Sequence, residues 1–177
     1  MPIRPFESKR PFIAESAYID PMATVIGAVE VGADASLWPG VVARGDIHFI
    51  KIGDNTNIQD GSVLHVSHDS EFAPGGFPLV VGRGVTVGHM VVLHGCTIED
   101  NCLIGMGSIV MDGAQVRAGA MLGAGSLVAP GKTLEGGYLW HGRPARRIRR
   151  LTADEQRYLT YSAEHYVRLK NRHRFDT

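Results

Sequence analysis

The sequence predicts an all-β solenoid, a parallel β-helix of hexapeptide repeats, with one α-helix at its C-terminal end. Aliphatic residues recur every six positions over most of the 177-residue chain, glycine occurs 22 times, and the last segment changes to a helical pattern. A period of six fits neither an amphipathic helix, near 3.6, nor a strand, near 2. It is typical of a solenoid in which each hexapeptide is a short strand plus a tight turn, and three hexapeptides make one triangular coil.

The repeat runs through the chain in three stretches. Its aliphatic positions are Ile19, Val25, Val31 and Leu37; then Ile52, Ile58, Leu64, Val81, Val87 and Leu93; and, after a slip of one residue, Ile98, Ile104, Val110, Val116, Leu122, Val128 and Leu134. Each of these side chains is expected to point into the coil and to stack on its copy in the next coil. Some are followed directly by glycine, namely Gly32, Gly53, Gly82, Gly88, Gly105 and Gly123. We expect these glycines to relieve corners where the backbone needs unusual dihedral angles.

The segments outside the repeat complete the predicted architecture. Residues 1–150 form the β-helix domain, in which the first 17 residues are irregular and the polar, Pro/Gly-rich residues 66–80 form an inserted loop. The phase is also lost around Arg44-Gly45-Asp46. Residues 151–177 contain a capping box, Thr152 and Glu155, and a helical pattern that continues to about Arg172. We expect this helix to pack along the solenoid.

Three histidines, His65, His89 and His94, lie within thirty residues of one another. If the loop is inserted at one corner, Leu93 stacks on Leu64, and His94 then stacks on His65. Neighbouring strands lie about 4.8 Å apart, so both rings can bind one metal ion with bonds of about 2.0–2.1 Å. His89 belongs to a different face, and a symmetry-related subunit could supply it. The spacing therefore predicts a metal site at a subunit interface.

Three histidines with an open fourth position are typical of catalytic zinc, which lowers the pKa of bound water to about 7. Gln59 and Asp60 could orient this water or the substrate, although Asn57-Ile58-Gln59-Asp60-Gly61 also reads as a plain polar turn. Arg44 and Asp46 fit an ion pair across an interface better than a direct catalytic role.

Composition limits the partners and the compartment. Lys plus Arg and Asp plus Glu each number 18, so the zero net charge gives no argument for nucleic acid or for a membrane as a partner. No apolar stretch fits a signal peptide or a bilayer span, and Cys96 and Cys102 fit two reduced core thiols, so we expect a cytoplasmic protein. The arginine-rich residues 143–150 fit a solvated patch or pairing with acidic neighbours.

Taken together, several motifs resemble the gamma class of carbonic anhydrases, and within it the short bacterial carbonic anhydrase-like proteins. These motifs are the hexapeptide repeat, Arg44-Gly45-Asp46, the run from Asn57 to His65, and His89-Met-Val-Val-Leu-His94. The resemblance covers nearly the whole chain. It implies a left-handed parallel β-helix that assembles as a homotrimer, with zinc, or iron or cobalt, at each interface. It also implies reversible hydration of carbon dioxide to bicarbonate by metal-bound hydroxide.

The resemblance assigns roles to individual residues. It implies that His65 and His94 come from one subunit and His89 from the next. Gln59 matches the family residue beside the bound water, within the motif that also holds Asn57. Arg44 and Asp60 match a pair across the interface that Asp46 supports. Tyr138 aligns loosely with a tyrosine near the metal.

The sequence also departs from the active family members. They carry Glu after the Arg-Gly-Asp triplet, where this chain has Ile47, and the loop residues His68, Asp69 and Glu71 do not align with the family's proton-shuttling glutamate. Low turnover or a different substrate would follow. Two alternatives therefore stay open: a metal-dependent acyl-CoA thioesterase or hexapeptide acyltransferase, whose CoA phosphates the arginine run could attract, and a metal-binding structural trimer with little turnover.

Overall fold

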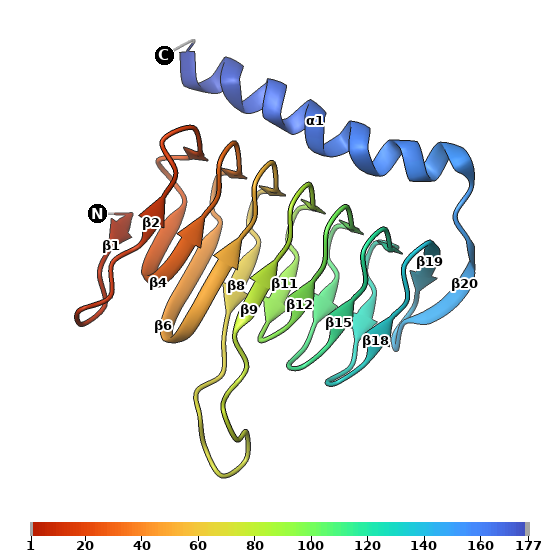
Figure 1. The fold of residues 1–177 in the computed structure, drawn as a ribbon, viewed down its shortest axis with the longest axis horizontal. Coiled ribbons are helices and arrows are strands. Elements are labelled where there is room, and N and C mark those ends of the chain that lie inside the picture. The colour runs from red at the N-terminus through yellow and green to blue at the C-terminus, as the bar shows by residue number, and fades with distance from the viewer. Residues whose placement is uncertain (1, 176–177) are drawn as a thin grey trace.

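The chain forms a solenoid of stacked parallel coils with one helix laid along its side (Figure 1). The computed structural model describes residues 2–175. The helix α1 (Ala153–Phe175) runs back from the last coils towards the first. The predicted β-solenoid of hexapeptide repeats with a C-terminal helix is confirmed, and the helix ends three residues beyond the expected Arg172.

Three faces of hydrogen-bonded strands enclose the core. The first face holds β8 (Val63–His65), β11 (Val92–His94), β14 (Ile109–Val110) and β17 (Leu127–Val128), and the second holds β9 (Leu79–Val81), β12 (Thr97–Ile98), β15 (Gln115–Val116) and β18 (Thr133–Leu134). The third is an eight-stranded sheet in the order β20 (Arg146–Arg150), β19 (Tyr138–His141), β16 (Met121–Leu122), β13 (Leu103–Ile104), β10 (Thr86–Val87), β7 (Asn57–Ile58), β5 (Ser36–Leu37), β3 (Tyr18–Ile19).

The long strand β6 (Val42–Ile52) joins the first two faces. Its start pairs with β8 and its end with β9, so the chain passes through one corner without leaving the sheet. The loss of phase around Arg44 is therefore a bend within a strand. The structure also corrects the expectation of an irregular N-terminus, because β1 (Ile3–Arg4) and β2 (Phe12–Ile13) both pair in parallel with β4 (Thr24–Val31). The edge of β4 offers backbone groups that these residues satisfy.

The predicted aliphatic positions form the core. From Val25 to Leu134 all of them are buried, and partners in neighbouring coils stack in register, as Leu64 does with Leu93 and Leu93 with Val110. Each coil covers the apolar face of the next, so no coil can bury its own core alone.

The glycines that follow these aliphatic residues have a different role from the predicted one. The left-handed corners use other residues, such as Asn55 (φ 58°) and Asn101 (φ 54°). Gly53 and Gly105 are needed because adjacent coils approach closely. A Cβ atom added at Gly53 would lie 2.6 Å from the carbonyl of Gly82, and one added at Gly105 would lie 2.5 Å from the backbone nitrogen of Ala124. These glycines therefore permit coil stacking.

Helix α1 covers the eight-stranded sheet. The predicted capping box is present: the Glu155 amide donates to Thr152 Oγ1 (3.2 Å), and the Thr152 amide donates to the Glu155 carboxylate (2.9 Å). Near the other end, the Lys170 side chain is 1% exposed and donates to Asp34 Oδ1 and to the Ser16 carbonyl, both at 2.6 Å. These contacts fix both ends of the helix. No helix in residues 2–175 is long and apolar enough to cross a membrane.

The segment between β8 and β9 projects away from the solenoid as a loop (Figure 1). Its two arms are joined by backbone hydrogen bonds between Ser67 and Phe77, at 3.0 and 2.9 Å. Strand β9 already begins at Leu79, within the range 66–80 that the sequence suggested for the loop.

Leu134→Ala is expected to lower the free energy of unfolding by about 2–5 kcal/mol, because it opens a cavity in the stacked column. Leu134 is fully buried, whereas its neighbour Thr133 in the same strand is exposed. Thr133→Ala is therefore expected to change stability by no more than about 0.5 kcal/mol. Urea unfolding at one protein concentration compares the two variants. Equal losses of unfolding free energy would contradict the role of Leu134 in the stacked aliphatic column.

Candidate metal centre

His65 and His94, which we call the histidine pair, lie side by side at the ends of adjacent parallel strands. Strands β8 and β11 pair with His94 opposite His65, so the register that the repeat predicted is confirmed. The ring centroids are 5.1 Å apart, and His65 Nδ1 lies 3.1 Å from His94 Nε2. One nitrogen of each ring therefore converges on the same point.

His89 lies away from this pair within the chain. It follows β10 in the eight-stranded sheet, at a different corner of the coil, and its side chain is 45% exposed. Among residues 2–175 no three His, Cys, Asp or Glu side chains gather closely enough to hold a metal ion. One subunit alone thus offers two histidines at one point and a third that faces outward.

Each of the three histidines donates a hydrogen bond to an aspartate. His65 Nε2 donates to Asp46 Oδ1 at 3.1 Å and His94 Nδ1 donates to Asp112 Oδ1 at 2.7 Å. His89 Nδ1 donates to Asp60 Oδ2 at 2.9 Å. A carboxylate bound to one ring nitrogen fixes the tautomer and leaves a lone pair on the other nitrogen. All three rings are thereby prepared to accept a cation.

The histidine pair fits a metal ion. With Asp46 and Asp112 each taking an N–H, the nitrogens that face each other across 3.1 Å both carry lone pairs, which repel unless a cation lies between them. Two nitrogens bound to one tetrahedral zinc at about 2.0–2.1 Å lie roughly 3.3 Å apart. Burial, together with Arg44 and His94, lowers the pKa of His65 against the opposing effect of Asp46. Its neutral ring, the form that binds metals, is favoured near pH 7.

Arg44 and Asp46 belong to the same cluster. Arg44 donates to Asp46 Oδ2 at 2.5 Å, while Asp46 Oδ1 accepts from His65. Burial alone would raise the pKa of Asp46, but the hydrogen bonds from Arg44 and His65 outweigh it, so the pKa lies below its usual value. Asp46 therefore stays ionised and holds the His65 ring. The resemblance pairs Arg44 with Asp60 across an interface, whereas within the chain Asp60 contacts His89.

The other predicted residues divide into two groups. Asn57 and Gln59 are buried and bonded to each other, with Gln59 Nε2 donating to Asn57 Oδ1 at 3.0 Å. Tyr138 lies on β19, three strands from β10, where the guanidinium groups of Arg147 and Arg150 stack on its ring at 4.8 and 5.2 Å. The chain does not bring Tyr138 to the histidine pair.

Sequence reasoning missed Asp112. This residue comes two positions after Val110, which stacks on Leu93, and its second oxygen accepts from Ser67 Oγ at 3.0 Å. The stacking places Asp112 one coil beyond His94, which the repeat could have indicated. Whether its side chain reaches back to the ring depends on rotamers that periodicity does not determine.

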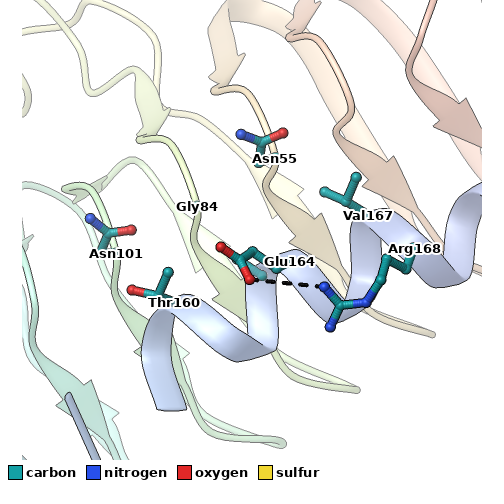
Figure 2. A pocket seen from close by; sticks show the side chains of 8 residues that line it. Asn55, Gly84, Asn101, Thr160, Glu164, Val167 and Arg168 are labelled. Carbon is teal, nitrogen blue, oxygen red and sulfur yellow. Dashed lines mark ion pairs between the residues drawn. The ribbon is translucent and has the colours of Figure 1, made fainter. Parts of the chain in front are cut away.

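A separate pocket lies between α1 and the corners of three coils (Figure 2). The residues that line it are Asn55, Gly84, Asn101, Thr160, Ala163, Glu164, Val167 and Arg168. The ion pair between Glu164 and Arg168, at 3.9 Å, lies across it. None of the predicted site residues lines this pocket.

The fold and the histidine arrangement define a hexapeptide-repeat solenoid with a candidate metal centre, and known proteins with similar sequences show which family the chain belongs to. The chain is 52% identical over 169 residues to Protein YrdA of Escherichia coli (strain K12), covering 96% of this chain and 92% of that protein. It is 44% identical over 165 residues to a carbonic anhydrase of Geobacillus kaustophilus, covering 93% and 87%. It is 41% identical over 165 residues to gamma carbonic anhydrase 1, mitochondrial, of Arabidopsis thaliana, covering 93% and 60%.

The chain belongs to the gamma carbonic anhydrase-like family of hexapeptide-repeat proteins. No protein-family model matches it. Among solved structures, a putative acetyltransferase of Bacillus cereus is similar with a TM-score of 0.88 and 43% identity, covering 95% of this chain and 94% of that one. A hexapeptide transferase family protein of Anaplasma phagocytophilum gives a TM-score of 0.87 and 42% identity, with 96% of both chains covered.

Asp112→Asn is expected to weaken zinc binding by about 10–100-fold, because the His94 ring loses the charged partner that orients it. Competition with a chromophoric zinc chelator measures the affinity. Asp100→Asn is the matched control, since Asp100 accepts the Arg83 backbone amide (2.8 Å) at a corner and touches no histidine. Unchanged affinity in Asp112→Asn would show that Asp112 does not support a metal ligand.

Proposed function

We propose that this protein is a zinc-dependent gamma-type carbonic anhydrase that hydrates carbon dioxide reversibly to bicarbonate at the interfaces of a homotrimer. The observation that carries the proposal is the set of three aspartate–histidine pairs, each leaving one ring nitrogen free. Relatives named carbonic anhydrase, which match most of the chain, support the reaction. Iron or cobalt could replace zinc in a site with these donors.

The surface beside His89 supports an intersubunit site. Met90, which follows His89, is 66% exposed, and Met106 is 58% exposed in the next coil, where the amide of its neighbour Gly107 donates to the His89 carbonyl. Val63, on strand β8, is 40% exposed. Exposed apolar clusters of this kind commonly mark contacts between proteins. In a cyclic trimer the corner that carries His89 would contact a different surface of the next subunit, the one that carries the histidine pair. His89 would then face the neighbour's histidine pair.

A zinc ion held by His65, His94 and a neighbour's His89 would lower the pKa of a water molecule to about 7 and so would supply hydroxide at neutral pH. The chain's own residues would prepare this site. Asp46, Asp60 and Asp112 orient the three rings, and Arg44 keeps Asp46 ionised. Gln59, one residue before Asp60, offers a side-chain amide that can hold the reacting water.

The proposed reaction also has to export a proton from the site to solvent. His68 and Glu71 are exposed in the projecting loop, and Asp69 Oδ1 accepts the Gly75 amide at 2.7 Å. Ile47, which is 43% exposed, stands where active relatives are expected to carry a glutamate. Because proton export often limits hydration, we expect a modest turnover.

A second candidate function is acyl transfer or acyl-CoA hydrolysis. A groove of about 420 Å³ runs under α1, and Gln59 lines it together with Met106, Met121, Tyr158 and Tyr166. The groove is larger than carbon dioxide needs, and its mostly apolar lining suits an acyl chain. The solved structure from B. cereus that resembles this chain is described as a putative acetyltransferase. A structural trimer with little turnover is the remaining alternative.

We also propose that the protein works in the cytoplasm. Cys96 and Cys102 are both free and buried, and burial raises the pKa of Cys102 to about 12. Protonated, buried thiols of this kind are inert core residues and suit a reducing compartment.

Protein purified without chelator is expected to hold about one zinc per chain and to hydrate carbon dioxide in a stopped-flow pH-indicator assay, because every chain supplies one set of three histidines. Acyl-CoA hydrolysis is measured on the same preparation. His94→Ala is expected to abolish hydration while circular dichroism stays unchanged. Hydrolysis without hydration would favour the second candidate, and zinc without either activity would favour the structural trimer.

His89→Ala and His94→Ala trimers are each expected to lose zinc, because every interface then lacks one ligand. Refolding an equimolar mixture should restore zinc and hydration to roughly one quarter of the wild-type level, since random assembly pairs an intact His65–His94 pair with a neighbour's intact His89 at that frequency. Native mass spectrometry confirms that mixed trimers form. Mixed trimers without recovered zinc would refute the shared site.

A further inference from the structure

A chain of buried polar side chains connects Gln59 to helix α1. Gln59 Nε2 donates to Asn57 Oδ1 (3.0 Å), Asn57 Nδ2 donates to Thr86 Oγ1 (3.1 Å), and the Thr86 hydroxyl donates to Ser162 Oγ (3.0 Å). These four side chains are between 1% and 6% exposed. Ser162 lies 76 residues from Thr86 in the sequence, on the helix.

The direction of this chain of hydrogen bonds is fixed by the backbone. Asn57 Nδ2 also faces the Val85 carbonyl oxygen at 3.4 Å, and a carbonyl oxygen can only accept. The Asn57 side-chain oxygen must therefore face Gln59, and the NH₂ group of Gln59 must donate to it. The carbonyl oxygen of Gln59 is then the free acceptor at the end of the chain.

That free end belongs to a residue that lines the groove under α1 and stands next in sequence to Asp60, the partner of His89, at the corner where we place the reaction site. Gln59 lines the groove under α1 together with Gly88, the residue before His89, and is followed by Asp60, which binds His89. A free amide could present either its oxygen or its nitrogen there. The hydrogen bonds to Asn57 and Thr86 select the oxygen, which can accept a proton of the reacting water.

We infer that Thr86 and Ser162 are positioning residues that hold the Gln59 amide with its oxygen towards the reaction site, so that helix α1 is part of the catalytic apparatus. This inference rests on the proposed function. It explains why two hydroxyl groups are buried between the sheet and the helix, where apolar side chains would pack without needing partners. It also gives the helix, which is anchored at its far end by Lys170, a role beyond covering the sheet.

The activity test removes one hydroxyl at a time. Thr86→Val keeps the shape of the side chain and is expected to lower kcat/KM for hydration by about tenfold with unchanged zinc content, whereas Thr86→Ser keeps the hydroxyl and should stay within about twofold. In a Gln59→Ala background, Thr86→Val should have no further effect, because it acts through Gln59. An equal loss with and without Gln59 would overturn the inference.

A second measurement does not depend on activity. In ¹⁵N NMR spectra of the metal-free trimer, with the signal assigned by Gln59→Ala, the Gln59 side-chain amide is expected to exchange with solvent about tenfold faster in Thr86→Val and in Ser162→Ala. Thr160→Ala is the matched control, since Thr160 lies on the same helix but lines the pocket of Figure 2. Wild-type protein that does not hydrate carbon dioxide would refute the proposed function alone. An unchanged exchange rate of the Gln59 side-chain amide in both variants would refute the positioning role.

Discussion

The in-register stacking of coils is the constraint on which the rest of this structure depends. Each aliphatic side chain is covered only by its copies above and below, so one coil cannot shift by a residue without exposing its apolar side. This constraint is what places His94 opposite His65. It also requires glycine where successive coils touch, as at Gly53. The same repeat that supplies the core therefore supplies the geometry of two candidate ligands.

Three aspartates convert these histidines from ordinary side chains into candidate ligands. Asp46, Asp60 and Asp112 each occupy one nitrogen of a ring, and they come from three different coils or corners. Two of the rings face each other with their lone pairs, an arrangement that favours a cation between them. The third points outward beside exposed methionines. A single chain is in this sense an incomplete site, and the proposed trimer is a way to complete it.

Helix α1 links the site to the scaffold. Its capping box fixes its start, and Lys170 fixes its far end on the first coils. Between these anchors, Ser162 meets the polar chain that ends at Gln59, and the groove opens beside it. The proposed positioning role and the second candidate function both depend on this one helix–sheet contact.

The sequence alone determined the solenoid, the C-terminal helix and the pairing of His65 with His94, because a period of six propagates through every coil and fixes register without knowledge of side-chain rotamers. Tertiary structure decided the rest. The N-terminal strands form because β4 has a free edge, and Asp112 supports His94 because its side chain reaches back across a coil. Asp60 likewise contacts His89, 29 positions away, and the polar chain from Gln59 reaches the helix through the hydrogen bond between Thr86 and Ser162, which are 76 positions apart. Such contacts depend on where side chains point in space, which a repeat does not encode.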